Sequence, residues 1–208
     1  TFKDKYFAIP GDMVNAEQFW GTMSTGTCPG ATGGVGTETC SGNGLNDIDN
    51  ASNEDETGEN FTFWQHLANA GLIEGSYTGI AGSGSRLDAI AGVNAPASKM
   101  TSAGWIVNTV GGGGSGTMYA VEHGNHFVFG AKRNNYGMSD PALTPEEAWN
   151  IDMKSDDGLP ASGSITARYW NDLCSSANDG VSANNDLDAS YRLSDDSVQC
   201  ALHFTNAF

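Results

Sequence analysis

The 208-residue chain is strongly acidic, although charged residues make up only 16% of it. Nine Lys and Arg stand against 25 Asp and Glu, which gives a formal net charge of −16. Such a chain repels phosphate backbones and anionic lipid headgroups, so we expect neither nucleic-acid binding nor attachment to a membrane surface. Twenty-eight glycines predict a loop-rich fold, while five Trp, six Tyr and nine Phe supply anchors for a hydrophobic core.

The N-terminal residues have the pattern of the end of a helix. Phe2 and Tyr6 are four positions apart on one face of residues 1–7, and the following sequence Ile9-Pro10-Gly11 would stop a helix. Seven amphipathic residues are too few to form a stable helix alone. We therefore expect the last turns of a longer helix, in a processed product or a truncated form, since the chain lacks an initial Met and a signal segment.

Two further helices are predicted farther along the chain. Residues 60–70 carry two apolar stripes and are followed by Gly71, which indicates a largely buried helix that ends at a glycine. Residues 144–154 begin with TPEE, in which Thr144 can act as N-cap, the proline suits the first helical position and Glu147 can complete a capping box.

Strand-like alternation of apolar and polar residues begins at Trp105. We expect a three-stranded antiparallel meander joined by the turns GGGGSG and HGN, with strands WIVNTV (105–110), TMYAVE (117–122) and HFVFGA (126–131). Residues 159–208 predict a short strand or turn and a long loop, after which VQCALHF (198–204) could add an edge strand. Together with the helices, this predicts an α+β fold in a single domain, residues 1–208.

The four cysteines fall into two local groups and predict disulfides. None is part of a CxxC motif, and no histidine is interleaved at zinc-finger spacing, so a metal cluster explains them poorly. Three pairings are open, and the one with the shortest loops joins Cys28 to Cys40 and Cys174 to Cys200. An even number of cysteines in a chain of this composition favours an oxidising compartment, so we expect an exported protein.

An acid-rich loop, IDMKSDDGLP (151–160), is the candidate metal site. It gathers Asp152, Asp156 and Asp157 at a turn, and hard oxygen ligands are those that calcium prefers. The spacing differs from that of an EF-hand. The alternative is a helix end in which the aspartates cap backbone N–H groups. A second acidic stretch holds Asp47, Asp49, Asn50, Asp55 and Glu56, and we expect it to be a solvated loop.

The histidines offer a weaker metal hypothesis. His123 and His126 flank a predicted turn, and a zinc site would need a third ligand, for which Glu122 is the only local candidate. Turn chemistry accounts for both residues without a metal. His66 lies in the predicted buried helix, where we expect a hydrogen-bonded core residue.

No motif in the chain supports enzyme chemistry, so we expect a non-enzyme. There is no GxSxG sequence, the glycine run lacks the Lys-Ser/Thr ending of a phosphate-binding loop, and the cysteine count favours disulfides over a thiol nucleophile. A secreted carbohydrate-binding or adhesin module is the alternative class, for which an exposed Trp20, Trp105 or Trp170 would be the sign. Each could equally be a core aromatic residue.

Three segments together resemble the globular part of bacterial type IV pilins and related prepilin-type proteins: FKDKYFAIPGDMVNAEQFWG (2–21), FWQHLANAGLIEGSYTG (63–79) and LTPEEAWNIDMKSDDGLPASGSI (143–165). The last third fits more loosely, through a C-terminal loop that a disulfide from Cys174 to Cys200 would close. The resemblance implies a pilin-like fold, in which residues 1–7 end an N-terminal helix, mostly absent here, that packs on an antiparallel sheet. The irregular loop 22–60 and the C-terminal loop 174–200 would face outward.

The resemblance also implies what the protein does. It predicts a structural subunit of an extracellular type IV pilus or pilin-like filament, made from a precursor in the bacterial inner membrane and assembled with other pilin subunits. Surface adhesion, through a surface or glycan ligand, would be decided on the outward loops. A pseudopilin of type II secretion shares this fold, and its similarly placed acidic loop can hold calcium, which adds to the hypothesis for Asp152, Asp156 and Asp157. No other cofactor is expected.

Overall fold

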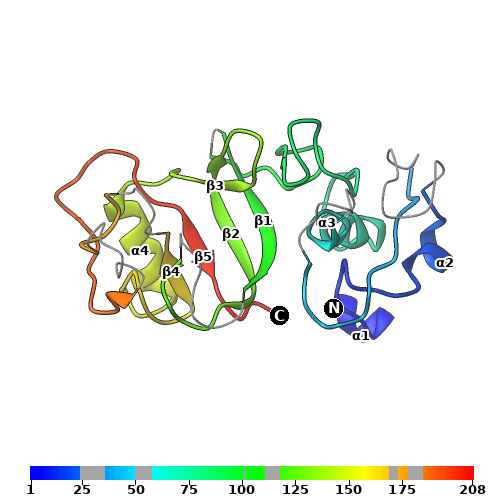
Figure 1. The fold of residues 1–208 in the computed structure, drawn as a ribbon, viewed down its shortest axis with the longest axis horizontal. Coiled ribbons are helices and arrows are strands. Elements are labelled where there is room, and N and C mark those ends of the chain that lie inside the picture. Colours follow the sequence, from blue (N-terminus) through cyan, green and yellow to red (C-terminus); the bar gives the residue numbers. More distant parts are fainter. Residues whose placement is uncertain (24–35, 50–57, 101, 111–117, 169–172, 178–184) are drawn as a thin grey trace. The chain divides into compact units, whose positions relative to one another are not determined.

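The computed structural model describes residues 1–23, 36–49, 58–100, 102–110, 118–168, 173–177 and 185–208 (Figure 1). The fold is α+β, as expected, and the chain divides into two compact units. Unit 1 comprises Thr1–Ser98, Ile106–Asn108 and Asn134–Gly137, and unit 2 comprises Lys99–Trp105, Thr109–Arg133 and Met138–Phe208. The prediction of a single domain stays a prediction.

Unit 1 contains three helices, α1 (Phe2–Tyr6), α2 (Ala16–Trp20) and α3 (Glu59–Asn69). The expected helix over residues 60–70 is confirmed as α3, which is buried along most of its length. It ends at Asn69, and after the C-cap Ala70 comes Gly71, whose φ of 71° lies in the left-handed region that suits a glycine after a helix. Its N–H donates to the carbonyl of Ala68.

The short helix α1 packs within unit 1 through the two aromatic residues that share its face. The rings of Phe2 and Tyr6 are 4.5 Å apart, and Phe2, only 4% exposed, also lies against Trp20 of α2 and stacks on His66 of α3. These tertiary contacts hold a helix that is too short to form alone. That α1 is the last part of a longer helix stays a prediction.

Most of unit 2 is built on a sheet with strand order β1-β2-β5-β4, in which β3 also pairs with β2 and only Ile106–Asn108 of β1 belong to unit 1 (Figure 1). The strands are β1 (Ala103–Val110), β2 (Gly124–Lys132), β3 (Met138–Asp140), β4 (Ile165–Ala167) and β5 (Leu202–Phe204). The pairs β2–β3, β2–β5 and β4–β5 are antiparallel, which confirms the predicted antiparallel sheet. β5 lies between β2 and β4.

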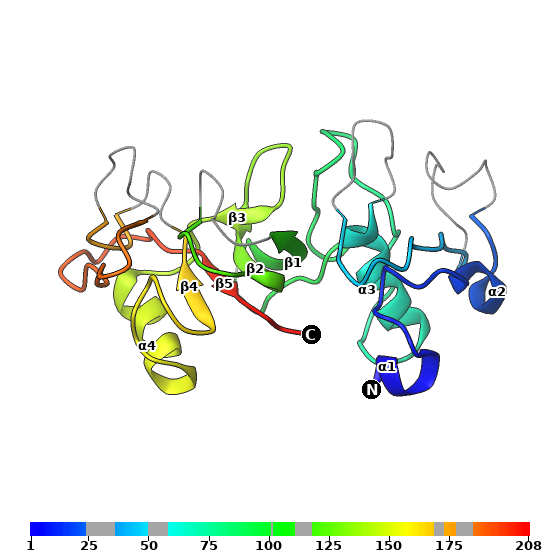
Figure 2. The same ribbon diagram turned by 60° about the horizontal axis from the view of Figure 1, so that its bottom comes forward.

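One face of this sheet is apolar and carries the main core of unit 2. Leu202 of β5 pairs with Phe129 of β2 and with Ala167 of β4, and all three are buried. The helix α4 (Pro145–Ser155) contributes Ala148 to this core and lies beside β4 (Figures 1 and 2). The opposite face carries Val128, His203 and Thr166 in one row across the three strands.

The start of α4 confirms the predicted capping signals. Thr144 is the N-cap, and its hydroxyl accepts from the N–H of Glu147 at 3.2 Å. The Glu147 carboxylate accepts from the N–H of Thr144 at 2.9 Å, and Pro145 occupies the first turn. The reciprocal bonds satisfy N–H groups that a helix start otherwise leaves without partners.

Two strand predictions were wrong. Residues 118–122 form bends instead of a strand. The side chain of Tyr119 is buried in a cluster with Ala161, Ala177 and Ala189 that is separate from the core of the sheet, and an extended edge strand would not place it there. The C-terminal segment does form a strand, but β5 is internal to the sheet, since β4 arrives as a further partner. The predicted GGGGSG turn lies outside the described residues.

A disulfide joins Cys174 to Cys200, as predicted from the C-terminal resemblance, and closes a loop across 26 positions. Cys40 is also disulfide-bonded, while Cys28 lies outside the described residues. Cys200 is fully buried and lies two positions before the central strand β5, so the crosslink lies inside the main core. Within the described part of the chain, no helix has the length and apolar character needed to cross a membrane.

Replacing both ends of this crosslink, in Cys174→Ala/Cys200→Ala, should lower the free energy of unfolding by about 3.5 kcal/mol, since the unfolded chain regains the entropy of a loop of this length. Urea denaturation followed by circular dichroism measures the change. Val198→Ala is the matched control, because Val198 is exposed within the same loop. It should change stability by less than about 0.5 kcal/mol. Equal midpoints for both variants would contradict the prediction.

Candidate functional site

The structure brings together the three aspartates that the sequence singles out. Asp152 lies in the last turns of α4, Asp156 is the C-cap of that helix and Asp157 follows it. One oxygen from each carboxylate lies within 4.8 Å of the others. Asp152 is fully buried, whereas Asp157 is exposed, so the group extends from the interior to the surface.

Backbone and hydroxyl donors already occupy these carboxylates. Asp152 accepts from the N–H of Gly158 at 3.0 Å and from the hydroxyl of Tyr191 at 2.8 Å. Asp156 accepts from the N–H of Ile165 at 2.8 Å, and Asp157 accepts from the N–H of Leu159 at 2.8 Å. The capping alternative raised by the sequence is therefore present. Asp156 Oδ2 accepts from the N–H groups of both Ser164 and Ile165, whereas each oxygen of Asp152 accepts a single bond and keeps a lone pair that could meet a cation.

The buried member of this group holds its proton more tightly than an ordinary aspartate. Burial raises the pKa of Asp152 to about 6, the bonds from Tyr191 and Gly158 oppose the shift, and the charges of Asp157 and Asp156 add to it. Burial, followed by the charge of Asp152, raises the pKa of Tyr191. A divalent cation at the three carboxylates would relieve this repulsion.

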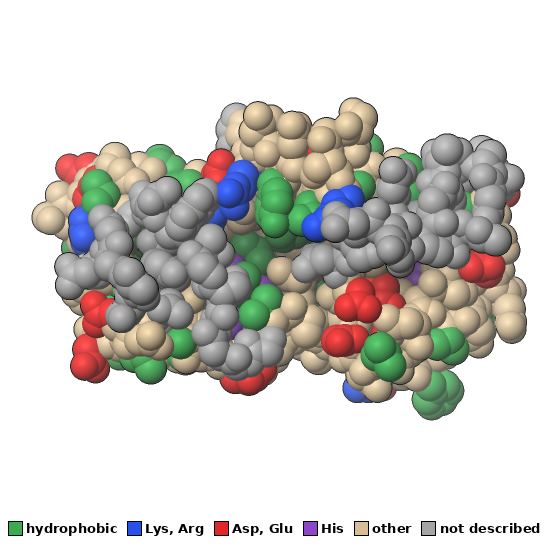
Figure 3. Space-filling model, in the orientation of Figure 1, with side chains coloured by type: hydrophobic (Ala, Val, Ile, Leu, Met, Phe, Trp, Pro, Cys, Tyr) green, Lys and Arg blue, Asp and Glu red, His purple; other side chains and the backbone are tan. Residues whose placement is uncertain are grey.

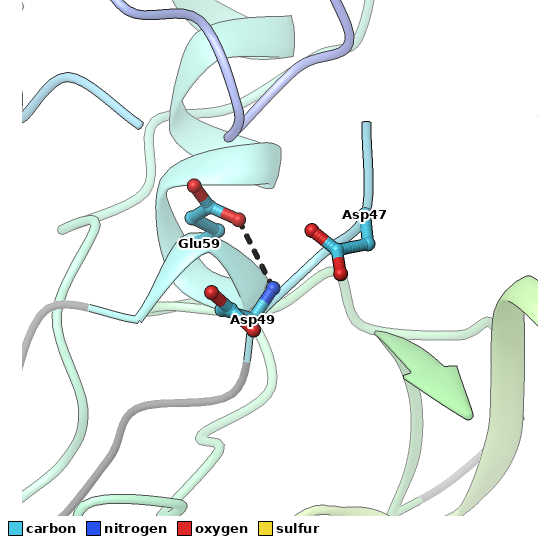
Figure 4. A group of neighbouring side chains, drawn as sticks. All are labelled: Asp47, Asp49 and Glu59. Carbon is cyan, nitrogen blue, oxygen red and sulfur yellow. Dashed lines mark hydrogen bonds between the residues drawn. The ribbon is translucent and has the colours of Figure 1, made fainter. Parts of the chain in front are cut away.

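A second carboxylate group, in unit 1, joins Asp47 and Asp49 to Glu59, the first residue of α3 (Figure 4). Their oxygens also lie within 4.8 Å of one another. Sequence reasoning missed Glu59 as a member, since it is ten positions from Asp49 and reads as the start of a helix. Asp49 is exposed and Asp47 half-buried, but Glu59 is only 7% exposed, so the expected solvated loop is only partly solvated. Asn50, Asp55 and Glu56 lie outside the described residues.

Glu59 is the anchor of the second group. Its carboxylate accepts from the N–H groups of Asn43 at 2.8 Å and Asp49 at 3.0 Å, so it ties the 43–49 loop to α3. Burial raises the pKa of Glu59 to about 7, those two bonds oppose the shift, and the charges of Asp12 and Asp49 add to it. Asp12 is itself buried and accepts from the N–H groups of Leu45 and Asn46.

One oxygen in the second group is buried without a hydrogen-bond donor. Asp47 Oδ1 has no partner among the described residues, whereas the carboxylates of Asp152, Asp156 and Asp157 each accept at least one bond. A buried carboxylate oxygen without a donor costs free energy, which a bound cation would recover. On this criterion, the group around Glu59 fits a cation at least as well as the group predicted from the sequence.

The structure places the two histidines at the sheet. His126 lies in β2, as the predicted strand 126–131 implies, and His123 directly precedes β2, which begins at Gly124 instead of after the predicted HGN turn; both histidines are fully buried. Burial lowers the pKa of His126 to about 4, while its bond to the Gly124 carbonyl opposes the shift and His123 adds to it. The prediction for His66 is confirmed, since it is buried and hydrogen-bonded on both ring nitrogens.

The tryptophans considered for carbohydrate binding are half-buried. Trp20 lies 5.2 Å from the ring of His66, and Trp105 lies 4.9 Å from that of Phe129 in the core of the sheet. The side chains of Trp20 and Trp105 therefore contribute mainly to packing. Trp170 lies outside the described residues.

Comparisons with models of protein families, with curated proteins and with solved structures found no match to this chain.

The raised pKa of Glu59 predicts an acid-stabilised unit 1. A carboxyl whose pKa rises from 4.5 in the unfolded chain to about 7 in the folded protein binds its proton more tightly when folded. Its contribution is fully present below pH 4.5 and is lost as the pH rises through 7. In Glu59→Gln, the free energy of unfolding of unit 1 should lose this slope between pH 4.5 and 7.

Urea titrations without divalent cations at several pH values test the prediction, with Glu74→Gln as the control. Glu74 is an exposed carboxylate of the same unit, so its removal changes the net charge equally without touching a buried group. Parallel pH profiles for wild type and Glu59→Gln would contradict the assignment.

Proposed function

We propose that the chain is the outer globular part of a structural subunit of an extracellular type IV pilus or a pilin-like filament. The function is assembly and surface display, without catalysis. The observation that carries the proposal is the C-terminal segment, which the disulfide between Cys174 and Cys200 fastens to an antiparallel sheet. This is the arrangement that the resemblance predicts. The segments that carry the resemblance contribute α1, α2, part of α3 and α4.

The physical demands on an outer filament domain agree with this proposal. A subunit exposed on a cell surface must stay folded outside the cell, and crosslinks provide stability that a loop-rich chain with 28 glycines draws less easily from its core. Acidic side chains appear at several places on the face shown in Figure 3, consistent with a surface that stays soluble. The outward loops would decide contact with other surfaces.

Calcium is part of the proposal as a stabilising ligand, not as a catalyst. The group Asp152, Asp156 and Asp157 sits where α4 meets the loop that leads to β4, so a cation there would fasten the helix end to the sheet. The group around Glu59 would fasten the 43–49 loop to α3 in the same way. Both offer the carboxylate oxygens that calcium prefers.

The filament proposal is tested on the organism's own cells. Antibodies against this domain should label surface filaments in immunogold electron microscopy, and deletion of the gene should remove the label. The coding sequence upstream of Thr1 should supply a cleavable leader and an apolar segment of roughly 20 residues, long enough for the membrane and the filament core. Label confined to the periplasm would favour the pseudopilin alternative, and label without filaments would overturn both.

Calcium should raise the melting temperature of the chain, and EDTA should reverse the rise. Free calcium at a hundredfold excess over the dissociation constant would add about 2.7 kcal/mol to the folded state. Asp157→Asn should weaken the effect of the first group and Asp47→Asn that of the second, whereas Asp188→Asn, at an exposed position outside both groups, should leave it unchanged. Calorimetry that shows no shift at millimolar calcium would remove calcium from the proposal.

A further inference from the structure

Three histidines from distant parts of the chain meet in the interior of unit 2. His123 and His126 lie at the start of β2, and His203 is the middle residue of β5, which pairs with β2 (Figure 1). Their ring centroids are 5.5, 5.7 and 5.4 Å apart. His123 and His126 are 0% exposed and His203 is 2% exposed. Fully buried imidazoles are expected to have hydrogen-bond partners on their nitrogens.

This trio leaves four ring nitrogens without partners among the described residues. They are His123 Nδ1, His126 Nε2 and both nitrogens of His203. By contrast, His66 of unit 1 accepts from the N–H of Gly11 through Nδ1 and lies 3.1 Å from the carbonyl of Cys40 through Nε2. A buried polar atom without a partner costs free energy, so this concentration of them points to a missing ligand.

The bonds that the trio does make identify the free lone pairs. His123 Nε2 lies 3.0 Å from the carbonyl of Tyr119, and His126 Nδ1 lies 3.0 Å from the carbonyl of Gly124. A carbonyl only accepts, so both of these nitrogens carry the proton. In a neutral ring, the other nitrogen is then an unprotonated lone pair. This is the arrangement of a histidine that binds a metal through one nitrogen while a backbone carbonyl fixes the other.

The size of the trio fits a transition-metal ion. A point equidistant from the three ring centroids lies about 3.2 Å from each. This distance matches the sum of a zinc–nitrogen bond, about 2.0–2.1 Å, and the distance from that nitrogen to the ring centre, roughly 1.1 Å. As the rings stand, only the two carboxylate groups bring three ligand atoms within 4.8 Å of one another among the described residues. Binding therefore requires at least one ring to turn, and His203, with neither nitrogen bonded among the described residues, can turn without breaking a hydrogen bond.

We propose that His123, His126 and His203 form a binding site for a divalent first-row transition metal, zinc above all, inside unit 2. Three neutral imidazoles suit zinc, copper or nickel, and they suit calcium and magnesium poorly. His203 needs no fixed tautomer, since either of its nitrogens is available. The site is distinct from both carboxylate groups and would crosslink β2 to β5 from the polar face of the sheet, opposite the disulfide-bonded core.

Two neighbouring side chains define the surroundings of the ion. Thr166 pairs with His203 across β4 and β5, and its buried hydroxyl has no partner among the described residues, so it can hold a water in the fourth coordination position. The guanidinium of Arg168 acts on His203 with a positive charge that opposes a cation. Asp140, 3.4 Å from Arg168 Nη1, compensates part of that charge.

The test uses the full chain with its disulfides intact. The protein is stripped with EDTA, placed in millimolar calcium to fill the carboxylate groups, and refolded from urea with a small excess of zinc, so that burial cannot prevent entry. After gel filtration, elemental analysis should find one zinc per chain. Cobalt in place of zinc should give the visible bands of tetrahedral coordination with nitrogen ligands.

Variants and a spectroscopic measurement assign the ion to the trio. His126→Gln and His203→Gln should each weaken zinc binding more than about 100-fold, beyond the usual effect of losing an outer partner of a ligand. His66→Gln, the matched buried histidine with both nitrogens bonded, should bind as the wild type does. Because a variant could fail to fold, imidazole ¹⁵N NMR of the wild type decides independently. Zinc should shift His123 Nδ1 and His126 Nε2 and leave His66 unchanged.

Three outcomes would contradict the proposed zinc site. Wild-type protein that keeps no zinc after refolding would overturn it. So would zinc that stays bound in both trio variants, or NMR shifts confined to residues outside the trio, since the ion would then lie on the carboxylates.

Discussion

Unit 2 depends on a strand of only three residues. β5 pairs with β2 on one side and β4 on the other, and Cys200, two positions before it, is crosslinked to Cys174. The backbone of Cys200 also exchanges hydrogen bonds with Leu143, just before α4. After β5, Thr205 donates to the carbonyl of Ser164 and Asn206 to that of His123. One short C-terminal segment thus connects elements from the whole second half of the chain.

The register of β5 determines what each face of the sheet contains. Leu202 and Phe204 point to the apolar core and His203 to the opposite face, because side chains alternate along a strand. A slip by one residue would place an imidazole in the core and two large apolar side chains on the polar face. The adjacent disulfide and the paired carbonyl of Cys200 fix the segment against such a slip. The same register brings His203 to the two histidines of β2.

Local signals predicted the helices, while the sheet required contacts that the sequence does not display. The stripes of α3 and the capping box of α4 lie within a few residues, so periodicity and cap chemistry were enough to find them. The position of β5 depends on partners 35 or more positions away, and residues 118–122 have strand-like composition but follow the burial of Tyr119. The burial of a large aromatic side chain in a separate cluster outweighs the strand propensity of the residues around it.

The candidate sites divide in the same way. Asp152, Asp156 and Asp157 lie within six positions of one another and were found, whereas Glu59 was missed because it reads as an ordinary helix start. For the histidines, the sequence lacked a third ligand near His123 and His126, since His203 is 77 positions beyond His126. The alternation in HFVF and ALHF was the available signal, because it places His126 and His203 on the side of their strands away from Phe129 and Leu202.

The acidic character of the chain gives these sites a common logic. Asp12, Glu59 and Asp152 are buried. In the part of the chain that the structure describes, they accept hydrogen bonds from backbone N–H groups and a tyrosine hydroxyl, with no lysine or arginine among the donors. Such bonds satisfy the oxygens but leave the net charge in place, and a hard cation from solution neutralises it most directly. The three histidines of unit 2 differ from these carboxylates, because a neutral imidazole offers a nitrogen lone pair but carries no charge. Oxygen groups and nitrogen groups therefore select different metals, so calcium in the surroundings would not compete for the trio.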